Sequence, residues 1–245
     1  MLSALVVKAS FYILLRLWLA IFSDISGGVA GRFGLLGAGA VLGGSWQALR
    51  QTQVKWLVAY STVAQVGYLF LAYPLASGMG ATAWSAMAYL ALSHALAKAA
   101  MFLAAGNMRQ FGGHDRIADL DRVVQRLPLT VGAFALAGVS IMGLPPSGGF
   151  NGKWLLLQAA LTQGRWDIVG IILLGGLLAA GYIFKVLGTT VTQAPITHEP
   201  ISVSARMQWA AMLLAIGAIL VGFLASPFLA LVGVGDPFNV GGLRP

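Results

Sequence analysis

One apolar run near the middle of the chain constrains the fold most, because it is too long for a single straight membrane crossing. The run extends from about Leu127 to Leu161, whereas a bilayer core of about 30 Å needs only about 20 helical residues. Its centre reads LPPSGGFNGKW, with Lys153 shortly after the prolines and glycines. This pattern predicts two half-helices joined by unwound backbone. The residues expected to break the helix are Pro145, Pro146, Gly148 and Gly149.

The remaining sequence has the composition of a polytopic membrane protein. Hydrophobic residues make up 58% of the chain and charged residues only 9%, whereas a soluble domain has about 25% charged residues. The other predicted spans are residues 2–23, 33–49, 56–76, 83–108, 168–187 and 207–232. We therefore predict an all-α membrane protein with about seven transmembrane helices, one of them discontinuous. Residues 1–232 would form a single transmembrane domain, and the Gly/Pro-rich residues 233–245 a flexible tail.

The basic residues between the spans predict an orientation. One side of the membrane would carry Arg50, Lys55, Arg109, Arg116, Arg122, Arg126 and Arg206, and the other Arg32, Arg165 and Arg244. The richer side is expected to be cytoplasmic. On that side, residues 109–126 alternate acidic and basic residues around apolar ones, which predicts an amphipathic helix as a cytoplasmic connector. The formal charge of +8 is thus a topology signal, and we expect no nucleic-acid partner.

Four titratable residues fall inside predicted spans: Lys8, His94, Lys98 and Lys153. A lysine at the centre of a membrane helix costs about 2.5–3.5 kcal/mol even on lenient scales, which favours a functional role. A buried amine can take up and release a proton, so these residues are predicted to form a proton pathway. His94 and Lys98 are four residues apart and share one helix face. The alternatives are a satisfied core histidine and snorkelling lysines, the latter strongest for Lys8 near the start of its span.

Polar and small residues indicate which spans face protein. The span 56–76 carries several hydroxyl and amide side chains and is expected to face other helices: Tyr60, Ser61, Thr62, Gln65 and Tyr68. The glycine-rich span 33–49 should allow close helix packing. Lys55 and Lys185 lie near span ends and are predicted to be interfacial anchors.

Other chemistry finds little support in the sequence. The chain has no cysteine, which excludes disulfides and thiolate-bound metals or iron–sulfur clusters. It also lacks a spaced histidine and carboxylate set, a GxGxxG motif after a strand and a pair of histidines suited to haem. We expect no catalytic residue, no metal and no redox cofactor in this chain.

Three segments together resemble a known family of membrane subunits. They are Gln51–Leu71 (QTQVKWLVAYSTVAQVGYLFL), Leu92–Gly106 (LSHALAKAAMFLAAG) and Leu127–Leu161. The resemblance is to the antiporter-like subunits of the proton-pumping NADH:quinone oxidoreductases, a family that includes the Mrp-type cation/proton antiporters and membrane-bound hydrogenases. The opening segment Ser3–Trp18 is most similar to the D subunit of the Mrp-type antiporters.

The resemblance implies a fold of about fourteen spans with two inverted repeats, each containing a broken helix. It implies that Lys8 ends the first half-channel, that Lys98 is the central lysine of the second, and that Lys153 follows the second broken helix. His94 matches the histidine one turn before the central lysine, whereas Leu90 replaces a further histidine of some relatives.

The likeness covers only the C-terminal half of such a subunit, so the first broken helix and the glutamate–lysine pair of the first half-channel are missing here. We expect either a second polypeptide that supplies that half or a truncated product. The implied function is proton translocation along intramembrane Lys, His and water within a multisubunit complex, driven by a redox module or a cation gradient. The alternatives are a Na⁺/H⁺ antiporter subunit of Mrp type and an inactive truncated scaffold.

The expected partners are other membrane subunits and the lipid bilayer. The expected location is the bacterial plasma membrane, and we identify no quinone site.

Overall fold

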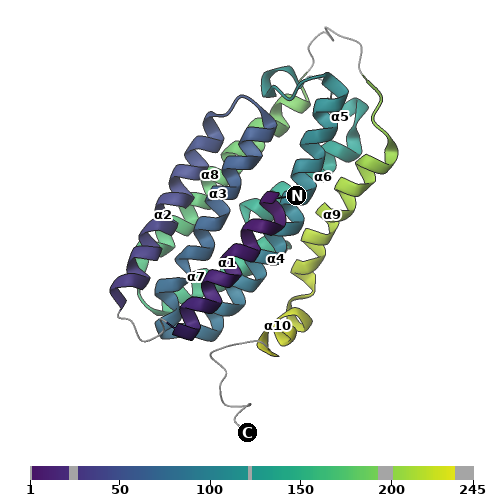
Figure 1. Ribbon diagram of the computed structural model, residues 1–245. Helices are drawn as coiled ribbons and strands as arrows, with labels where there is room; N and C mark the ends of the chain where they lie inside the picture. The colour runs from purple at the N-terminus through teal and green to yellow at the C-terminus, as the bar shows by residue number, and fades with distance from the viewer. Residues whose placement is uncertain (1, 22–26, 121–122, 193–200, 235–245) are drawn as a thin grey trace.

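The computed structural model describes residues 2–21, 27–120, 123–192 and 201–234. These residues form helices that lie side by side in an elongated bundle (Figure 1). The helices are α1 (Leu2–Ile21), α2 (Gly27–Arg50), α3 (Val54–Leu71), α4 (Tyr73–Gly112), the 3₁₀ helix η1 (Ile117–Asp119), α5 (Val123–Arg126), α6 (Pro128–Met142), α7 (Gly148–Thr162), α8 (Trp166–Thr190), α9 (Ala205–Phe223) and α10 (Ala225–Val234). The predicted all-α fold is confirmed for the described residues.

Close helix packing joins the first part of the bundle. Helix α2 packs against α3 and α8, while α4 contacts α6, α7 and α9. A side chain on Gly37 of α2 would come within 2.7 Å of the carbonyl oxygen of Gly67 on α3, closer than real carbon atoms approach. A side chain on Gly44 would likewise come within 2.7 Å of the backbone nitrogen of Ala64. The prediction that small residues in the span 33–49 permit close packing is therefore confirmed.

Four helical segments of the described chain are long and apolar enough to cross a membrane: Val54–Ala76, Gly80–Gly112, Trp166–Thr190 and Ala205–Phe223. The first runs through α3 into the start of α4, and the second lies within α4. The other predicted spans correspond to α1, to α2 and to the pair α6–α7. These helices lie alongside the longer ones in the bundle. Their number agrees with about seven crossings, which stays a prediction.

The start of α3 and the end of α4 meet at one end of the bundle. An antiparallel bridge joins Gln53 to Arg116. The N–H of Val54 donates to the carbonyl oxygen of Asp115 at 2.9 Å, and the N–H of Lys55 donates to Oδ2 of Asp115 at 3.1 Å. Asp115 thus caps α3 from the loop that follows α4. This contact brings Lys55 and Arg116 to the same end of the molecule, as the predicted charge pattern requires.

The segment 109–126 differs from the single amphipathic helix expected of it. Helix α4 continues to Gly112 and stops at Gly113, whose positive φ of 72° suits a residue without a side chain. The following residues form the bridge, η1 and the one-turn helix α5. The apolar side chains of Ile117, Leu120 and Val123 are nevertheless buried. Asp121 and Arg122 lie outside the described residues.

The last predicted span, 207–232, is also divided in the structure. Helix α9 ends at Phe223 and α10 begins at Ala225. Pro227 has no N–H to donate to the carbonyl of Phe223, which weakens a continuous helix. In addition, the carbonyl of Val221 accepts from the Tyr89 hydroxyl at 3.0 Å, and that of Gly222 accepts from Asn151 Nδ2 at 2.8 Å. The predicted flexible tail beyond Val234, including Arg244, lies outside the described residues.

Lys185 binds the C-terminal end of α2. Its Nζ donates to the carbonyl oxygens of Leu49 and Gln51, both at 2.7 Å. These carbonyls lie at a helix end, where the backbone lacks intrahelical partners. Lys185 therefore joins the end of α8 to the end of α2, as its predicted anchoring position near a span end suggests.

Replacing Lys185 with alanine is expected to lower the free energy of unfolding by about 1–3 kcal/mol, because two partly buried carbonyls lose their donor. The unfolding temperature of the purified protein in detergent should fall by several degrees. The Lys185→Arg variant, which retains N–H donors at this position, is the matched control. Equal unfolding temperatures for the alanine variant and the unsubstituted protein would show that water satisfies these carbonyls equally well.

Candidate functional site

The predicted helix break lies between α6 and α7. Helix α6 ends at Met142, and Gly143 follows in the left-handed conformation with φ of 81°. Pro145 and Pro146 lie in the unwound segment, whereas Gly148 and Gly149 form the first turn of α7. Ser147 caps α7 by accepting a hydrogen bond from the N–H of Phe150 at 3.2 Å.

The two glycines of α7 allow close packing at the break. A side chain on Gly149 would collide with the carbonyl oxygen of Ser140 on α6. A side chain on Gly148 would meet Val221 at 2.9 Å and Ser93 at 3.1 Å. Gly222 on α9 has no room for a side chain beside the carbonyl oxygen of Pro146. The break is therefore enclosed by α4, α6 and α9.

Lys153 reaches back from α7 to the end of α6. Its Nζ donates to the carbonyl oxygens of Ile141 at 2.8 Å and Met142 at 3.1 Å. The same Nζ lies 4.4 Å from the centre of the Tyr68 ring, within the range of a cation–π interaction. The side chain is buried, with 6% of its surface exposed. The lysine thus satisfies carbonyls that the break leaves without helical partners.

Lys98 occupies a second buried position, on α4. It has no exposed surface, and its Nζ donates to the carbonyl oxygen of Val58 at 2.9 Å and to the Ser61 hydroxyl. Both acceptors belong to α3. Within the described ranges, neither Lys98 nor Lys153 forms an ion pair with a carboxylate; the ion pairs found join Arg116 to Asp119 and Arg165 to Asp167. A charge on either amine is therefore compensated by neutral oxygens and, for Lys153, by the Tyr68 ring.

His94 is a further buried residue of α4, one helical turn before Lys98. Its side chain is 4% exposed. The Nε2 atom has no protein hydrogen-bond partner among the described residues. Lys8, on α1, is buried as well. All four predicted pathway residues are thus buried in the described part of the chain, and none of the hydrogen bonds given above joins two of them directly.

Polar side chains connect the surroundings of Lys98 with those of Lys153. Gln65 Nε2 donates to the carbonyl oxygen of Ile141 at 3.1 Å, the same oxygen that accepts from Lys153. The hydroxyl of Tyr182 on α8 is fully buried close to Ser61 and Gln65, and it has no hydrogen-bond partner among the described residues. Ser61 in turn binds Lys98. We call Ser61, Tyr182 and Gln65 the polar link.

Sequence reasoning anticipated part of this link. Ser61, Thr62, Gln65 and Tyr68 were expected to face protein, and all four are buried. Tyr60 was expected to do the same, but it is 37% exposed. Tyr182 was not identified, although its position as a hydroxyl within the apolar helix α8 was a usable signal.

Chemically, the site can hold and transfer protons. Lysine, histidine, serine and tyrosine side chains all carry exchangeable protons. Here they are buried in the same bundle as the carbonyls at the end of α6, which have no helical partners. A search of the described residues found no group of three or more His, Cys, Asp or Glu side chains suited to a metal ion.

Comparison with known proteins agrees with this fold. The family model described as "NADH:quinone oxidoreductase/Mrp antiporter, TM" matches residues 1–179. NADH-quinone oxidoreductase subunit N of Desulforudis audaxviator (strain MP104C) is 37% identical over 188 residues, which cover 76% of this chain and 37% of that protein. A second relative is 32% identical over 156 residues, which cover 63% of this chain and 24% of that protein. It is NADH-quinone oxidoreductase subunit L of Pseudomonas aeruginosa (strain ATCC 15692 / DSM 22644 / CIP 104116 / JCM 14847 / LMG 12228 / 1C / PRS 101 / PAO1).

Solved structures have the same fold. A chain of the Mrp complex from Dietzia sp. DQ12-45-1b superposes with a TM-score of 0.82 at 21% identity, covering 91% of this chain and 49% of that one. A chain of the membrane-bound sulfane sulfur reductase, an archaeal respiratory membrane complex, gives a TM-score of 0.78 at 23% identity, covering 91% of this chain and 38% of that one.

The bundle of apolar helices around a broken helix and buried lysines defines a multi-pass integral membrane protein of the antiporter-like class. The chain belongs to the NADH:quinone oxidoreductase/Mrp antiporter family. It spans only part of its curated relatives, 37% of the subunit N from Desulforudis audaxviator. The predicted family is thus confirmed, while the assignment to the D-subunit branch of the Mrp-type antiporters stays a prediction.

Proposed function

We propose that this chain is the second half-channel of a proton-translocating membrane subunit. A proton would move between Lys98 and Lys153 through the polar link, with His94 and Lys8 exchanging protons on the side of Lys98. The observation that carries the proposal is the shared Ile141 carbonyl, which accepts from both Gln65 and Lys153 while Ser61 accepts from Lys98. The shared acceptor brings the amide of Gln65 close to the amine of Lys153, and proton transfer requires such short separations between the groups that exchange the proton.

The broken helix would form the outer part of this pathway. Lys153 lies a few residues inside α7, and α7 runs from the break toward the end of the bundle where Arg165 and Asp167 lie. We propose that the pathway opens on this outer side, while the end with Lys55 and Arg109 faces the cytoplasm of a bacterial cell.

The energy for transport is proposed to come from other subunits. The described residues offer proton-exchanging groups, and the relatives are named as subunits of oxidoreductases. We propose that the chain works in the plasma membrane within a multisubunit complex, together with a membrane segment or subunit that corresponds to the rest of its relatives' length. Transport would then be driven by redox chemistry in a separate module. The alternative coupling is Na⁺/H⁺ exchange.

Everted membrane vesicles that contain the assembled complex would test the proposal. Vesicles with the chain should acidify inside when a redox substrate is added, and vesicles from cells lacking the chain should not. The internal pH can be followed with a fluorescent amine. A pH change triggered by Na⁺ without redox substrate would favour the antiporter alternative. Equal pH changes with and without the chain would favour an inactive scaffold.

Replacing Gln65 with leucine is expected to slow proton translocation about tenfold, which corresponds to ~1.4 kcal/mol in the barrier. Leucine removes the amide that joins the polar link to the Ile141 carbonyl, while Lys98 and Lys153 keep their own acceptors. The matched control is Ser93→Ala, which removes the buried 2.8 Å hydrogen bond between Ser93 and Ser140 but leaves the link intact. If both variants transport protons equally fast, Gln65 has only a packing role.

A further inference from the structure

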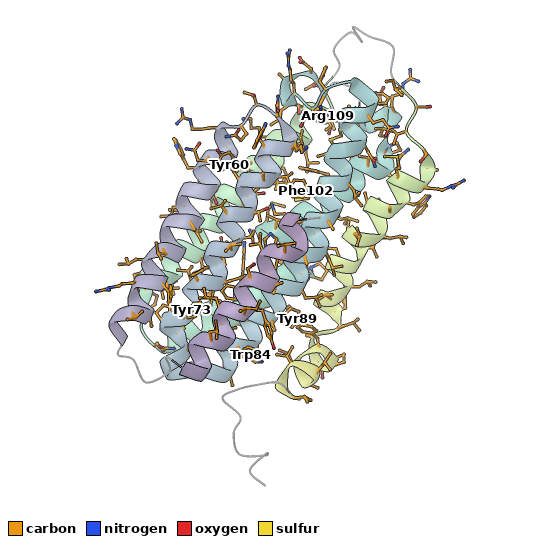
Figure 2. The ribbon with its side chains drawn as sticks, viewed as in Figure 1. Tyr60, Tyr73, Trp84, Tyr89, Phe102 and Arg109 are labelled. Atoms are coloured by element: carbon orange, nitrogen blue, oxygen red, sulfur yellow. The ribbon has the colours of Figure 1, made fainter. Side chains whose placement is uncertain are left out.

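A pocket near the cation-rich end of the bundle has a lining unlike that of the buried lysine site. It has a volume of about 540 Å³ and is lined by three cationic side chains, those of Lys55, Arg109 and Arg116. The aromatic side chains of Trp56 and Phe102 also line it. Figure 2 shows Arg109 near this end of α4, with Phe102 farther along the same helix toward the centre of the bundle.

One carboxylate, that of Asp115, lines the same pocket. Its Oδ2 accepts from the N–H of Lys55 at the first turn of α3. Its negative charge is therefore directed at the positive end of a helix dipole. Arg116 contacts Asp119 only at 3.9 Å, with both side chains largely exposed. A weak surface ion pair of this kind leaves the arginine available to an anion.

An apolar groove continues from this pocket toward the middle of the bundle. The groove has a volume of about 450 Å³ and lies between α1, α2 and α3. Its α3 side runs from Ala59, which also lines the charged pocket, through Val63 to Phe70. Leu36 of α2 and Val7 of α1 form the other walls. The charged pocket and the apolar groove share Ala59 as a lining residue, so they adjoin along α3.

The length of the groove matches one leaflet of a bilayer. At a rise of about 1.5 Å per residue, α3 advances about 16 Å between Ala59 and Phe70. Half of a hydrocarbon core of about 30 Å is about 15 Å. The charged end of the site would lie at the depth of lipid headgroups, where cations attract anionic lipids.

We propose that this site binds an anionic phospholipid, with its phosphate between Lys55, Arg109 and Arg116 and one acyl chain along the groove from Ala59 to Phe70. The three cations give the site a preference for a negatively charged headgroup. The apolar walls give it a preference for a lipid over a free anion. The aromatic rings of Trp56 and Phe102 would lie at the junction of headgroup and chain, where such rings are favoured.

Native mass spectrometry of the detergent-purified full chain would test the site with two lipids of matched acyl chains, phosphatidylglycerol and phosphatidylcholine. Phosphatidylglycerol should bind more tightly. The Arg109→Gln/Arg116→Gln pair should weaken its binding about thirtyfold, the factor for ~1 kcal/mol per cation. The control pair Arg126→Gln/Arg206→Gln, which removes two arginines that do not line the pocket, should leave the binding unchanged. Equal affinity for both lipids, or equal losses in both pairs, would overturn the proposal.

Photo-crosslinking in membranes of cells that make the whole complex would identify the occupant directly. A benzophenone amino acid replaces Val63, whose side chain lines the groove and is 47% exposed. A lipid adduct that diminishes in the Arg109→Gln/Arg116→Gln pair supports the proposal. A polypeptide adduct alone would show that a protein segment covers the groove and would overturn it. Displacement of phosphatidylglycerol by inorganic phosphate in the mass-spectrometric assay would instead indicate a simple anion pocket. None of these results depends on whether the chain transports protons.

Discussion

Replacing Lys98 with methionine is expected to lower proton translocation about 100-fold, the lower end of the effect of a positioned proton-transfer group. The side chain is fully buried, and its amine alone joins α4 to the Val58 carbonyl and to Ser61. Methionine fills a similar volume but carries no exchangeable proton. Reconstituted complex with the substituted chain should therefore retain its subunits while losing acidification of the vesicle interior.

The Lys98→Arg variant separates proton transfer from a purely structural charge. Arginine keeps a positive charge and N–H donors, but it does not release its proton in proteins. It should therefore be as inactive as methionine, even where it assembles normally. Lys185→Gln serves as the control, because Lys185 lies at the end of α8 and binds only helix-end carbonyls. Normal transport by the arginine variant would exclude Lys98 as a group that takes up and releases the proton.

Replacing Gly149 with alanine is expected to lower the stability of the protein strongly. The added methyl group would collide with the carbonyl oxygen of Ser140, and this atom belongs to the backbone, so a side-chain rotation cannot relieve the clash. Overpacking of this kind costs about 1–3 kcal/mol or more. Helices α6 and α7 would have to separate, which would also move Lys153 away from the Ile141 carbonyl. We expect a lower unfolding temperature in detergent and loss of transport.

A matched control for this substitution exists in α8. Gly188 is also helical, but a side chain there would meet no atom within 4 Å. Because alanine has the higher helix propensity, Gly188→Ala should keep or slightly raise the unfolding temperature. Unfolding temperatures that agree for Gly149→Ala and the unsubstituted protein would show that α6 and α7 can separate at little cost.

Of the two helix breaks, one was predictable from the sequence and the other was not. The break at Pro145 and Pro146 was predictable because proline removes a backbone donor wherever it lies in a helix. The break at Leu224 was not predicted, although Pro227 follows it. There the carbonyls of Val221 and Gly222 bind Tyr89 and Asn151, which come from α4 and α7. A local pattern cannot reveal acceptors that are taken by distant side chains.

The residues of the candidate site likewise include some that the sequence predicted and some that it did not. Lys98 and Lys153 were predictable because a lysine within an apolar span is costly and demands a reason. The hydroxyl of Tyr182 within the apolar helix α8 was a signal in the sequence, but the sequence does not decide whether such a side chain faces lipid or protein. Only the packing of α8 decides that this hydroxyl lies close to Ser61 and Gln65. Tyr60 was misplaced for a related reason, since the exposed face of α3 depends on which helices lie beside it.

The sequence by itself determined the membrane environment, the helical class, the broken span and the buried lysines. These properties follow from local quantities: the hydropathy of a segment, the missing donor of proline and the cost of placing an amine among apolar residues. The tertiary structure alone decided that Lys153 binds the end of α6, that Gln65 shares its Ile141 acceptor, and that a charged pocket joins an apolar groove at Ala59. Such contacts join residues far apart in the chain, so they arise only when the helices pack together.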